Sequence, residues 1–575
     1  MFRPVSVANQ RLLDGVLERT DLLRREPHKI YPWFVRPCRV RTLLVTDGGL
    51  DFGGGDFGLS TFVSILLNDT LNFVRFELTL AHLSSDVSDG DVMAGEAGIA
   101  RSIKDFRFDE PDHFTPELYD EVWLFGIETS LHRSSYATRD GDHDRYPADR
   151  LGDAELAALS AFMNGGGGLF ATGDHGRLGR CLGGSVSRAR SMRLWDHTSA
   201  NNDLDQVSMG GPRRNDTNRP GDPGTQFDDQ SDDIPQTIEP LLYSAWVSPF
   251  FKARWPHPVL CGPRGVIRVL PDHPHEGECV EPGDLSATYE FDGSPEYPPA
   301  TDGSGPIEPE VIATSSVPAG NTAGTKDATV AHSFGAIGAY DGHRAGVGRV
   351  VTDATWHHFV NINLVGEIGI PETEVKGRGF LASAAGEAHL EDIKAYYRNI
   401  AVWIAPPGRH VCFRSRLTWS LLHEHRVVEA VFTHPDLSLD KAHVSHLYEL
   451  GAHARDVLGK RASRCQSRQW ILDVIWEEIP ELIPEIDPWY RIREPIPPRP
   501  PFVNPEPLID IALGGALLAL REEFQLPRED VTDILEERAP DLIARGATVA
   551  IHRGVEALTE ASGRYAGGGG KRTIG

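Results

Sequence analysis

Four short clusters of aspartate and histidine could supply acid–base or metal chemistry. They lie at residues 45–49, 172–176, 271–277 and 352–358, and each follows a run of residues typical of a buried strand. In an open α/β sheet the carboxyl ends of the strands meet at one edge, where ligands bind. The sequence therefore predicts that the four clusters share one cleft.

The third cluster is the densest of the four. In an extended segment His273 and His275 point to one side, and Asp272 and Glu276 point to the other. A His-x-His pair completed by a carboxylate from elsewhere suits zinc or iron. We therefore predict a divalent metal held by these four residues and Asp47. The alternative is a polar turn, because prolines and a glycine surround the cluster.

The remaining histidines are candidates for general acid–base catalysis, because an imidazole changes its charge near neutral pH. His357 and His358 follow a strand-like run that ends at Asp353, and Asp174 and His175 follow another such run. We predict that these five residues are catalytic or orient catalytic groups. The alternatives are a histidine packed under the neighbouring tryptophan and a helix-capping role for the aspartate of the second cluster.

A glycine-rich loop suggests a dinucleotide site only weakly. Residues 53–58 match the Gly-x-Gly-x-x-Gly pattern of dinucleotide-binding loops and lie between an expected strand and an expected helix. The strand ends too early, however, and Asp51 and Asp56 would repel a pyrophosphate. A dinucleotide-dependent oxidoreductase is therefore the weaker alternative, and a loop that shapes the edge of a site is favoured.

Cys181 lies in a Gly-x-Cys-x-Gly pattern that is typical of a nucleophile elbow. Such an elbow needs the strand to run directly into the cysteine, which presents the thiol at the edge of the sheet. Here the expected strand ends at Gly173, about eight residues earlier. We therefore expect Cys181 to be a small buried residue rather than a nucleophile.

Strand-like and helix-like segments alternate along the first part of the chain, which indicates a doubly wound α/β sheet. The expected strands are residues 39–47, 76–82, 121–126, 259–270 and 346–352, and residues 165–173 are expected to end a helix and form a further strand. The expected helices are residues 60–68, 92–103, 153–163 and 387–404. Long stretches between about 180 and 330 are rich in Asp, Asn, Gly and Pro, which is typical of surface insertions.

The C-terminal part changes character and is expected to be helical at 417–431, 438–458, 469–475, 508–524, 528–537 and 539–561. The predicted fold is α/β, a flavodoxin-like parallel sheet with long insertions followed by an α-helical C-terminal region. Its expected parts are a helical lead-in at 1–38, the α/β domain at 39–405 with insertions at about 180–330, a helical region at 411–494, a proline-rich linker at 495–505, a helical module at 506–562 and a flexible tail at 563–575.

Charge and composition limit the classes of binding partner and cellular location that we expect. The net charge of −26 argues against nucleic acid or an anionic membrane as the main partner. No run approaches the ~20 apolar residues of a membrane helix, and the N-terminus lacks the apolar core of a signal peptide. Six widely spaced cysteines without a CxxC pair predict reduced thiols. We expect a cytoplasmic protein with a small-molecule substrate, a carbohydrate being one candidate.

Residues 165–175, Gly-Gly-Gly-Gly-Leu-Phe-Ala-Thr-Gly-Asp-His, resemble the glycine-rich strand entry of the class I glutamine amidotransferase-like superfamily. Its trehalose-utilisation (ThuA-like) branch is nearest, where a comparable segment ends in a histidine near the position of the glutaminase cysteine. Residues 348–358 resemble that branch's closing strand, which also leads to a histidine. The resemblance covers about residues 39–405 and implies a flavodoxin-like sheet with a site at the strand ends. Because no cysteine directly follows the strand, it does not imply glutamine hydrolysis through a thioester.

These observations favour an enzyme of hydrolytic or sugar-processing type that uses the Asp/His clusters, with a bound divalent metal as one form of the hypothesis. A different class of function remains open. The chain could be a non-catalytic ligand-binding or assembly protein that keeps the superfamily sheet. In that case residues 411–575 would form a homo-oligomer or dock a partner.

Overall fold

The protein is described from a computed structural model of its 575 residues. The structure describes residues 36–68, 73–84, 98–128, 130–131, 147–175, 177–195, 215, 235–248, 250–271, 277–320, 328–422, 424, 427, 437–461, 463–475, 483–490, 504, 506–523 and 532–567. Most of the predicted lead-in and proline-rich linker lies outside these ranges.

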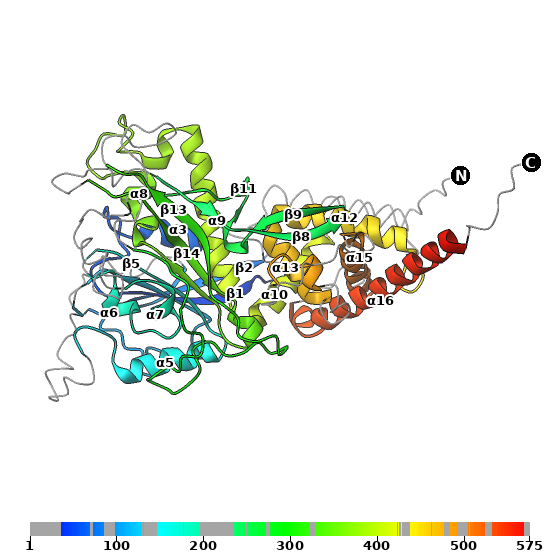
Figure 1. The fold of residues 1–575 in the computed structure, drawn as a ribbon, viewed down its shortest axis with the longest axis horizontal. Coiled ribbons are helices and arrows are strands. Elements are labelled where there is room, and N and C mark those ends of the chain that lie inside the picture. The colour runs from blue at the N-terminus through cyan, green and yellow to red at the C-terminus, as the bar shows by residue number, and fades with distance from the viewer. Residues whose placement is uncertain are drawn as a thin grey trace, which may run out of the picture.

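One mixed sheet forms the centre of the α/β domain, on the left in Figure 1, and has nine strands in the described part of the chain. The strand order is β3-β2-β1-β4-β5-β15-β14-β13-β7. The mutually parallel strands are β1 (Cys38–Thr46), β2 (Val74–His82), β3 (Ile99–Ile103), β4 (Glu121–Gly126), β5 (Gly168–Gly173) and β15 (Val350–Asp353). The α/β class and the mostly parallel, doubly wound sheet are thus confirmed. The six parallel strands follow the order 3-2-1-4-5-6, whereas a flavodoxin sheet has the order 2-1-3-4-5.

Three antiparallel strands extend the sheet beyond β15 and come from the region that was expected to be surface insertions. They are β14 (His332–Tyr340), β13 (Glu310–Val317) and β7 (Glu239–Pro240). β13 alternates buried and exposed residues over its second half, as a strand at a half-covered sheet does. The helix expected at 92–103 is wrong over residues 99–103, which pair with β2 as an edge strand. Residues 92–97 lie outside the described ranges.

Helices cover both faces of the sheet. One face carries α3 (Ser60–Asn68), α8 (Asn361–Val365) and α9 (Ala384–Ile404). Phe62 of α3 packs against Trp123 and Phe125 of β4 and against Tyr397 of α9. The other face carries α5 (Asp153–Asn164), α6 (Arg180–Gly183) and α7 (Ala189–Met192). The short pairs β6 (Gln236–Thr237) with β12 (Val269–Leu270) and β10 (Cys261–Gly262) with β11 (Gly265–Val266), and the hairpin β8 (Leu242–Ser248) and β9 (Phe251–Pro256), lie outside the main sheet.

The C-terminal helices continue the same hydrophobic core as α9 and its face of the sheet. They are α10 (Pro407–Leu421), α12 (Val444–Arg461), α13 (Arg464–Ile475), α14 (Ile483–Ile486), α15 (Glu506–Glu523) and α16 (Thr532–Gly567). α15 is buried at every position from Leu508 to Leu520 because α12 and α16 pack around it. The two helices expected on either side of residue 538 are one continuous helix, which passes through Pro540.

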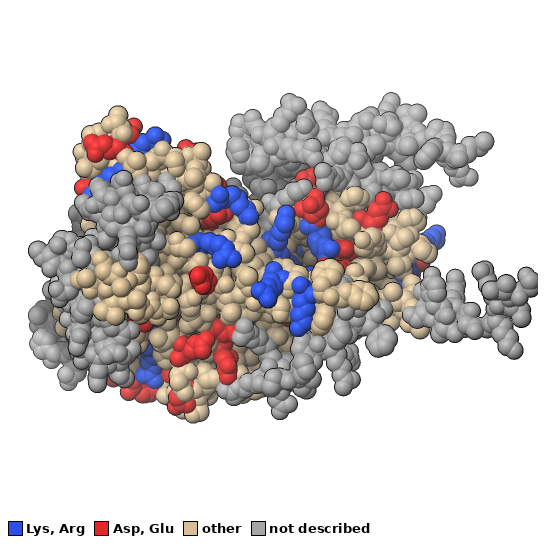
Figure 2. Space-filling model, turned by 45° about the horizontal axis from the view of Figure 1, so that its top comes forward, with Lys and Arg blue, Asp and Glu red and all other residues tan. Residues whose placement is uncertain are grey.

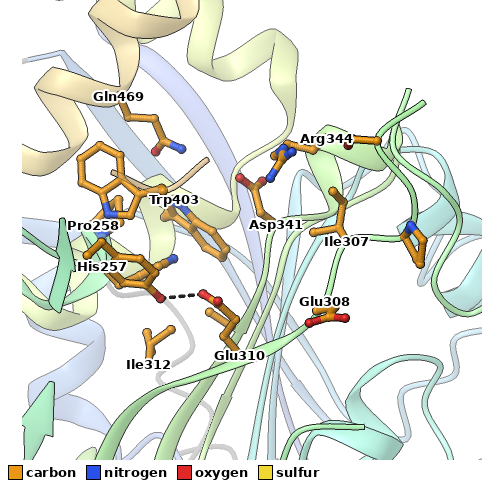
Figure 3. Close-up of a pocket in the computed structure, with 15 residues that line it drawn as sticks. His257, Pro258, Ile307, Glu308, Glu310, Ile312, Asp341, Arg344, Trp403 and Gln469 are labelled. Carbon is orange, nitrogen blue, oxygen red and sulfur yellow. Dashed lines mark hydrogen bonds between the residues drawn. The ribbon is translucent and has the colours of Figure 1, made fainter. Parts of the chain in front are cut away.

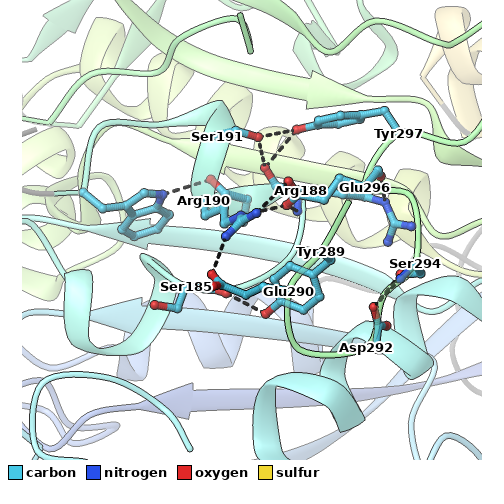
Figure 4. A network of polar contacts seen from close by, with 12 residues as sticks. Ser185, Arg188, Arg190, Ser191, Tyr289, Glu290, Asp292, Ser294, Glu296 and Tyr297 are labelled. Carbon is cyan, nitrogen blue, oxygen red and sulfur yellow. Dashed lines mark hydrogen bonds and ion pairs between the residues drawn. The ribbon is translucent and has the colours of Figure 1, made fainter. Parts of the chain in front are cut away.

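A buried ion-pair network fixes one insertion against the segment that follows β5 (Figure 4). Glu296, only 2% exposed, accepts hydrogen bonds from the Arg190 guanidinium at 3.0 and 3.1 Å and from the backbone N–H of Arg188 at 2.8 Å. Arg188 in turn donates from Nε to the Glu296 carbonyl at 2.7 Å. Because Glu296 and Arg188 are buried and each is paired, these contacts tie the chain after α6 to the insertion.

Charge is distributed unevenly over the surface. Figure 2 shows Lys and Arg side chains gathered near the boundary between the α/β domain and the C-terminal helices, although the chain carries a net charge of −26. Of the helices that the structure describes, none combines the length and the hydrophobicity that a membrane span requires.

A disulfide joins the helical region to the sheet and corrects the expectation that all cysteines are reduced. Cys38 begins β1 and bonds to Cys412 of α10, which packs against β1. The bond closes a loop between residues that are 374 positions apart in the sequence. Spacing along the chain gave no sign of this pair, because only the packing of α10 on β1 brings the two cysteines together.

We predict that Cys412→Ser lowers the free energy of unfolding by about 2–4 kcal/mol, because the bond restricts the unfolded chain. Thermal unfolding with and without a reducing agent measures the effect. Reductant should lower the midpoint of the wild type to that of the variant and leave the variant unchanged. An equal response of both proteins to reductant would contradict the pairing.

Candidate active site at the carboxyl edge of the sheet

Three of the four Asp/His clusters follow parallel strands and lie at the same edge of the sheet. Asp47 follows β1, Asp174 and His175 follow β5, and Asp353 ends β15. His357 lies in the short 3-10 helix Trp356–His358 that comes next. Contacts between the second and fourth clusters show that these two meet, as the sequence predicts.

The meeting point is a pair of imidazoles. The Nε2 atoms of His175 and His357 lie 3.1 Å apart, so that one ring donates a hydrogen bond to the other. His357 is only 3% exposed and stacks on Trp356, whereas His175 is half-buried. His175 also has a φ of 48°, a conformation that non-glycine residues adopt at a cost and that is concentrated at functional sites.

Asp174 lies beneath this pair and is fully buried. Its Oδ1 accepts the backbone N–H of His175 at 2.6 Å. Burial raises the pKa of Asp174. The charges of His175 and His357 and the side chain of Thr355 lower it by more than burial raises it, so the pKa lies below its ordinary value. The carboxylate therefore stays ionised and favours a positive charge on the imidazole pair.

Aromatic side chains form the outer wall beside the imidazoles. Phe57, which is 52% exposed, packs edge-on against Trp356 with ring centroids 5.9 Å apart. The centroid of the His175 ring lies 5.4 Å from that of Trp356. The pair thus lies next to an exposed apolar surface that a ligand can cover.

The glycine-rich loop shapes this wall and is held by α8. Asn361 donates from Nδ2 to the carbonyls of Gly53 and Gly55, at 3.1 and 2.7 Å. A Cβ on Gly58 would lie 2.1 Å from the Gly53 carbonyl oxygen, so no larger residue fits there. These contacts support the interpretation that the loop shapes the edge of a site.

Asp353 and His358 lie deeper than the imidazole pair and have no exposed surface. Asp353 accepts hydrogen bonds from His358 Nδ1 at 2.7 Å and from the Tyr396 hydroxyl at 2.6 Å. The other ring nitrogen of His358 contacts the Gln236 side chain of β6. These two predicted catalytic residues thus form a buried polar network that fixes the loop carrying His357.

A buried arginine holds the two strand ends together. The guanidinium of Arg193 donates to the carbonyls of Asp353 and Ala354, at 3.0 and 2.7 Å, to that of Leu178 at 2.8 Å, and to that of Gly173. Burial lowers the pKa of Arg193, while Cys279, Asp174 and Asp353 raise it. Its charge lies close to both buried carboxylates and balances them.

Asp47 joins the loops after β1 and β4. Its carboxylate accepts the backbone N–H groups of Ile127 at 2.6 Å, Glu128 at 2.8 Å and Gly49 at 3.2 Å. Burial raises the pKa of Asp47 to about 6, although these N–H groups lower it. The three hydrogen bonds occupy the carboxylate that was predicted to be a metal ligand.

The predicted metal residues Asp272, His273, His275 and Glu276 lie outside the described residues. On either side of them, Leu270 pairs with Gln236 of β6, and Gly277 lies against Ala354. Within the described ranges, no group of three or more His, Cys, Asp or Glu side chains is arranged to hold a metal ion. The metal thus stays a prediction.

Cys181 is 1% exposed, which confirms the expectation of a buried residue. Burial, followed by the charge of Asp47, raises the pKa of its thiol to about 11. The thiol is therefore protonated at neutral pH. Because only the thiolate is an effective nucleophile, Cys181 is not expected to attack a substrate.

Comparison with known proteins gives no relative. Neither protein-family models nor curated proteins nor solved structures match this chain.

Sequence reasoning did not find Phe57, Arg193, Gln236 or Tyr396. Gln236 and Tyr396 come from segments far from the clusters, and only the fold places them beside His358 and Asp353. Phe57 lies within the glycine-rich loop at residues 53–58. An aromatic residue among glycines is the one sequence signal that could have indicated it.

The raised pKa of Asp47 predicts a pH-dependent contribution to stability. A carboxyl group whose pKa is higher in the folded than in the unfolded state stabilises the fold at low pH, and this stabilisation is lost as the pH rises from about 4 to about 6. The shift of about two pH units corresponds to about 3 kcal/mol. Asp47→Asn, which cannot ionise, should therefore gain that amount relative to the wild type between pH 4 and pH 7.

Urea denaturation of both proteins across this pH range measures the difference in the free energy of unfolding. Parallel profiles for the wild type and Asp47→Asn would show that the carboxyl titrates at its ordinary pH in the folded protein.

Proposed function

We propose that the protein is a hydrolase in which His175 and His357 share a proton and activate water. The observation that carries the proposal is the 3.1 Å contact between their Nε2 atoms above the buried carboxylate of Asp174. Such a pair supplies a general base that becomes a general acid after it has accepted a proton. The resemblance of residues 165–175 and 348–358 to the amidotransferase-like superfamily supports an active site at this edge.

In the proposed reaction the half-buried His175 is the ring that a substrate contacts. It removes a proton from water as the water oxygen attacks an electrophilic carbon. The positive charge is shared with His357 and is stabilised by Asp174. The same proton then goes to the leaving group as its bond to the carbon breaks. Water is the only reagent consumed, and both histidines return to their initial state.

The aromatic wall supports a substrate with an apolar face. Phe57 and Trp356 lie beside the imidazole pair, and Phe57 is exposed. The face of a sugar ring packs well on such a surface, which keeps glycosides and sugar esters as the first substrates to examine.

Substitution of either histidine should abolish hydrolysis. We expect His175→Ala and His357→Ala each to lower kcat/KM at least 100-fold on any probe that the wild type cleaves, because general acid–base catalysis contributes about 10²–10⁴-fold. Panels of p-nitrophenyl esters and p-nitrophenyl glycosides are suitable probes. His453→Ala, which removes an exposed histidine of α12, is the matched control and should retain full activity. Full activity in either site variant, or no hydrolysis of any probe by the wild type, counts against the proposal.

A second form of the proposal places a divalent metal between the two imidazoles. Two nitrogen ligands about 2.1 Å from one tetrahedral zinc ion lie about 3.4 Å apart. The Nε2 atoms here are 3.1 Å apart, so a small shift of either ring would admit the ion. Elemental analysis of the purified wild type and variants separates the two forms. Zinc or iron at one equivalent, lost in His175→Ala and His357→Ala but kept in His453→Ala, supports the metal form. A metal content that is the same in all four proteins supports the proton-sharing form.

A further inference from the structure

A cavity lies at the opposite edge of the sheet from the imidazole pair. It has a volume of about 280 Å³ and is lined by residues from β8, β13, β14, α9 and α13. Because β14 is antiparallel to β15, its end at Tyr340 lies at the edge where the parallel strands begin. Cavities between parts of a protein are frequent ligand sites, and this one lies between the α/β domain and the C-terminal helices.

Apolar side chains form part of the cavity wall. Ile312 and Trp403 are almost fully buried, and Ile307 is 9% exposed. Trp489 and Tyr243 complete the aromatic part of the lining. The volume lies just below the usual range of small-molecule pockets, so that a ligand with a compact apolar body fits best.

One side of the cavity is negatively charged. Figure 3 shows Glu310 and Glu308 together on this side, with the Glu310 carboxylate pointing toward the tyrosine that it contacts. Glu310 accepts a hydrogen bond from the Tyr243 hydroxyl at 2.7 Å. Two carboxylates beside aromatic rings form a favourable environment for an ammonium group.

The other side carries a guanidinium with unused hydrogen-bonding capacity. Arg344 lines the cavity across from Glu310, as Figure 3 shows, and its guanidinium lies 4.6 Å from the centre of the Tyr490 ring. Its Nη2 is buried and has no hydrogen-bond acceptor among the described residues. The neighbouring Asp341 carboxylate is already bound by Arg349 Nε at 2.7 Å.

A second buried donor also lacks an acceptor. The indole Nε1 of Trp403, a residue that is 1% exposed, has no hydrogen-bond partner in the described part of the chain. His257, which packs against Trp403 with ring centroids 4.6 Å apart, adds no charge, because burial lowers its pKa to about 3. Unpaired buried donors cost free energy, and a ligand acceptor removes this cost.

The geometry points to a binding site for a small zwitterion, the chemistry of an apolar α-amino acid. Its carboxylate binds Arg344 and the indole N–H of Trp403, its ammonium group binds Glu310 and Glu308, and its side chain packs against Ile307, Ile312 and Trp489. A simple cation would leave both donors unpaired. A simple anion would be repelled by the two glutamates. The site is independent of hydrolysis at the other edge of the sheet.

Matched ligands test the proposal on the intact protein. L-phenylalanine, L-leucine and L-methionine are titrated into the wild type by calorimetry, together with phenethylamine, which lacks the carboxylate, and 3-phenylpropionate, which lacks the ammonium group. We expect at least one of the three amino acids to bind. If phenylalanine binds, phenethylamine and 3-phenylpropionate should each bind at least tenfold more weakly than phenylalanine. Absence of binding by all three amino acids, or equal binding of phenylalanine and its analogues, overturns it.

Substitutions that remove one charge each locate the binding site. Arg344→Gln and Glu310→Gln should each weaken binding of the amino acid at least tenfold, because each removes a charged hydrogen-bonding partner. Arg254→Gln and Glu281→Gln change exposed residues outside the cavity and should bind as the wild type does. Equal affinity in all four variants shows that the amino acid binds elsewhere and overturns the assignment. Circular dichroism confirms that each variant is folded before its affinity is compared.

Discussion

The candidate active site depends on the buried guanidinium of Arg193. Parallel strands end with carbonyl groups that point toward one edge, and here the carbonyls after β5 and β15 accept hydrogen bonds from a single side chain. The same charge lies beside Asp174 and Asp353, two carboxylates without exposed surface. Without this cation the strand-end carbonyl groups would lose a buried donor, and the negative charges of Asp174 and Asp353 would depend on the neighbouring histidines and Tyr396 alone.

The histidines near this cation have different roles. His358 is locked between Asp353 and Gln236, so that its ring orientation is fixed and its surface is covered. His357 lies one residue earlier, on a turn whose first backbone N–H bonds the Thr355 hydroxyl at 3.0 Å, and its ring meets His175. The buried network therefore supports a pair of rings of which one contacts solvent. This gives the pair a defined geometry before any substrate binds.

The sequence predicted much of the sheet because its strands are short apolar runs between glycine and aspartate. β4 occupies the expected residues, β5 lies within the expected segment 165–173, and α3 and α9 lie within a few residues of their expected bounds. It also predicted that Asp174 and His175 would lie near His357, since parallel strand ends converge. It could not show that β13 and β14 join the sheet, because antiparallel pairing leaves no signal in the sequence beyond alternation along each strand.

The deeper contacts of the site were also beyond prediction from sequence. Nothing in the spacing of Arg193, Tyr396 or Gln236 relates them to the Asp/His clusters, because each reaches the site from a different layer of the fold. The disulfide between Cys38 and Cys412 has the same cause, since the two residues are brought together only when α10 packs on β1. Local patterns predict elements, whereas burial and pairing between elements decide which polar groups face one another.

The account's central claim is that His175 and His357 share one proton under the influence of Asp174. The most direct measurement is a pH titration of the ring signals by NMR, on protein labelled with carbon-13 at the histidine Cε1 position. The account predicts that the signals of His175 and His357 move together over one pH range, and that Asp174→Asn shifts both midpoints to lower pH. Independent titrations that Asp174→Asn leaves unchanged would contradict it.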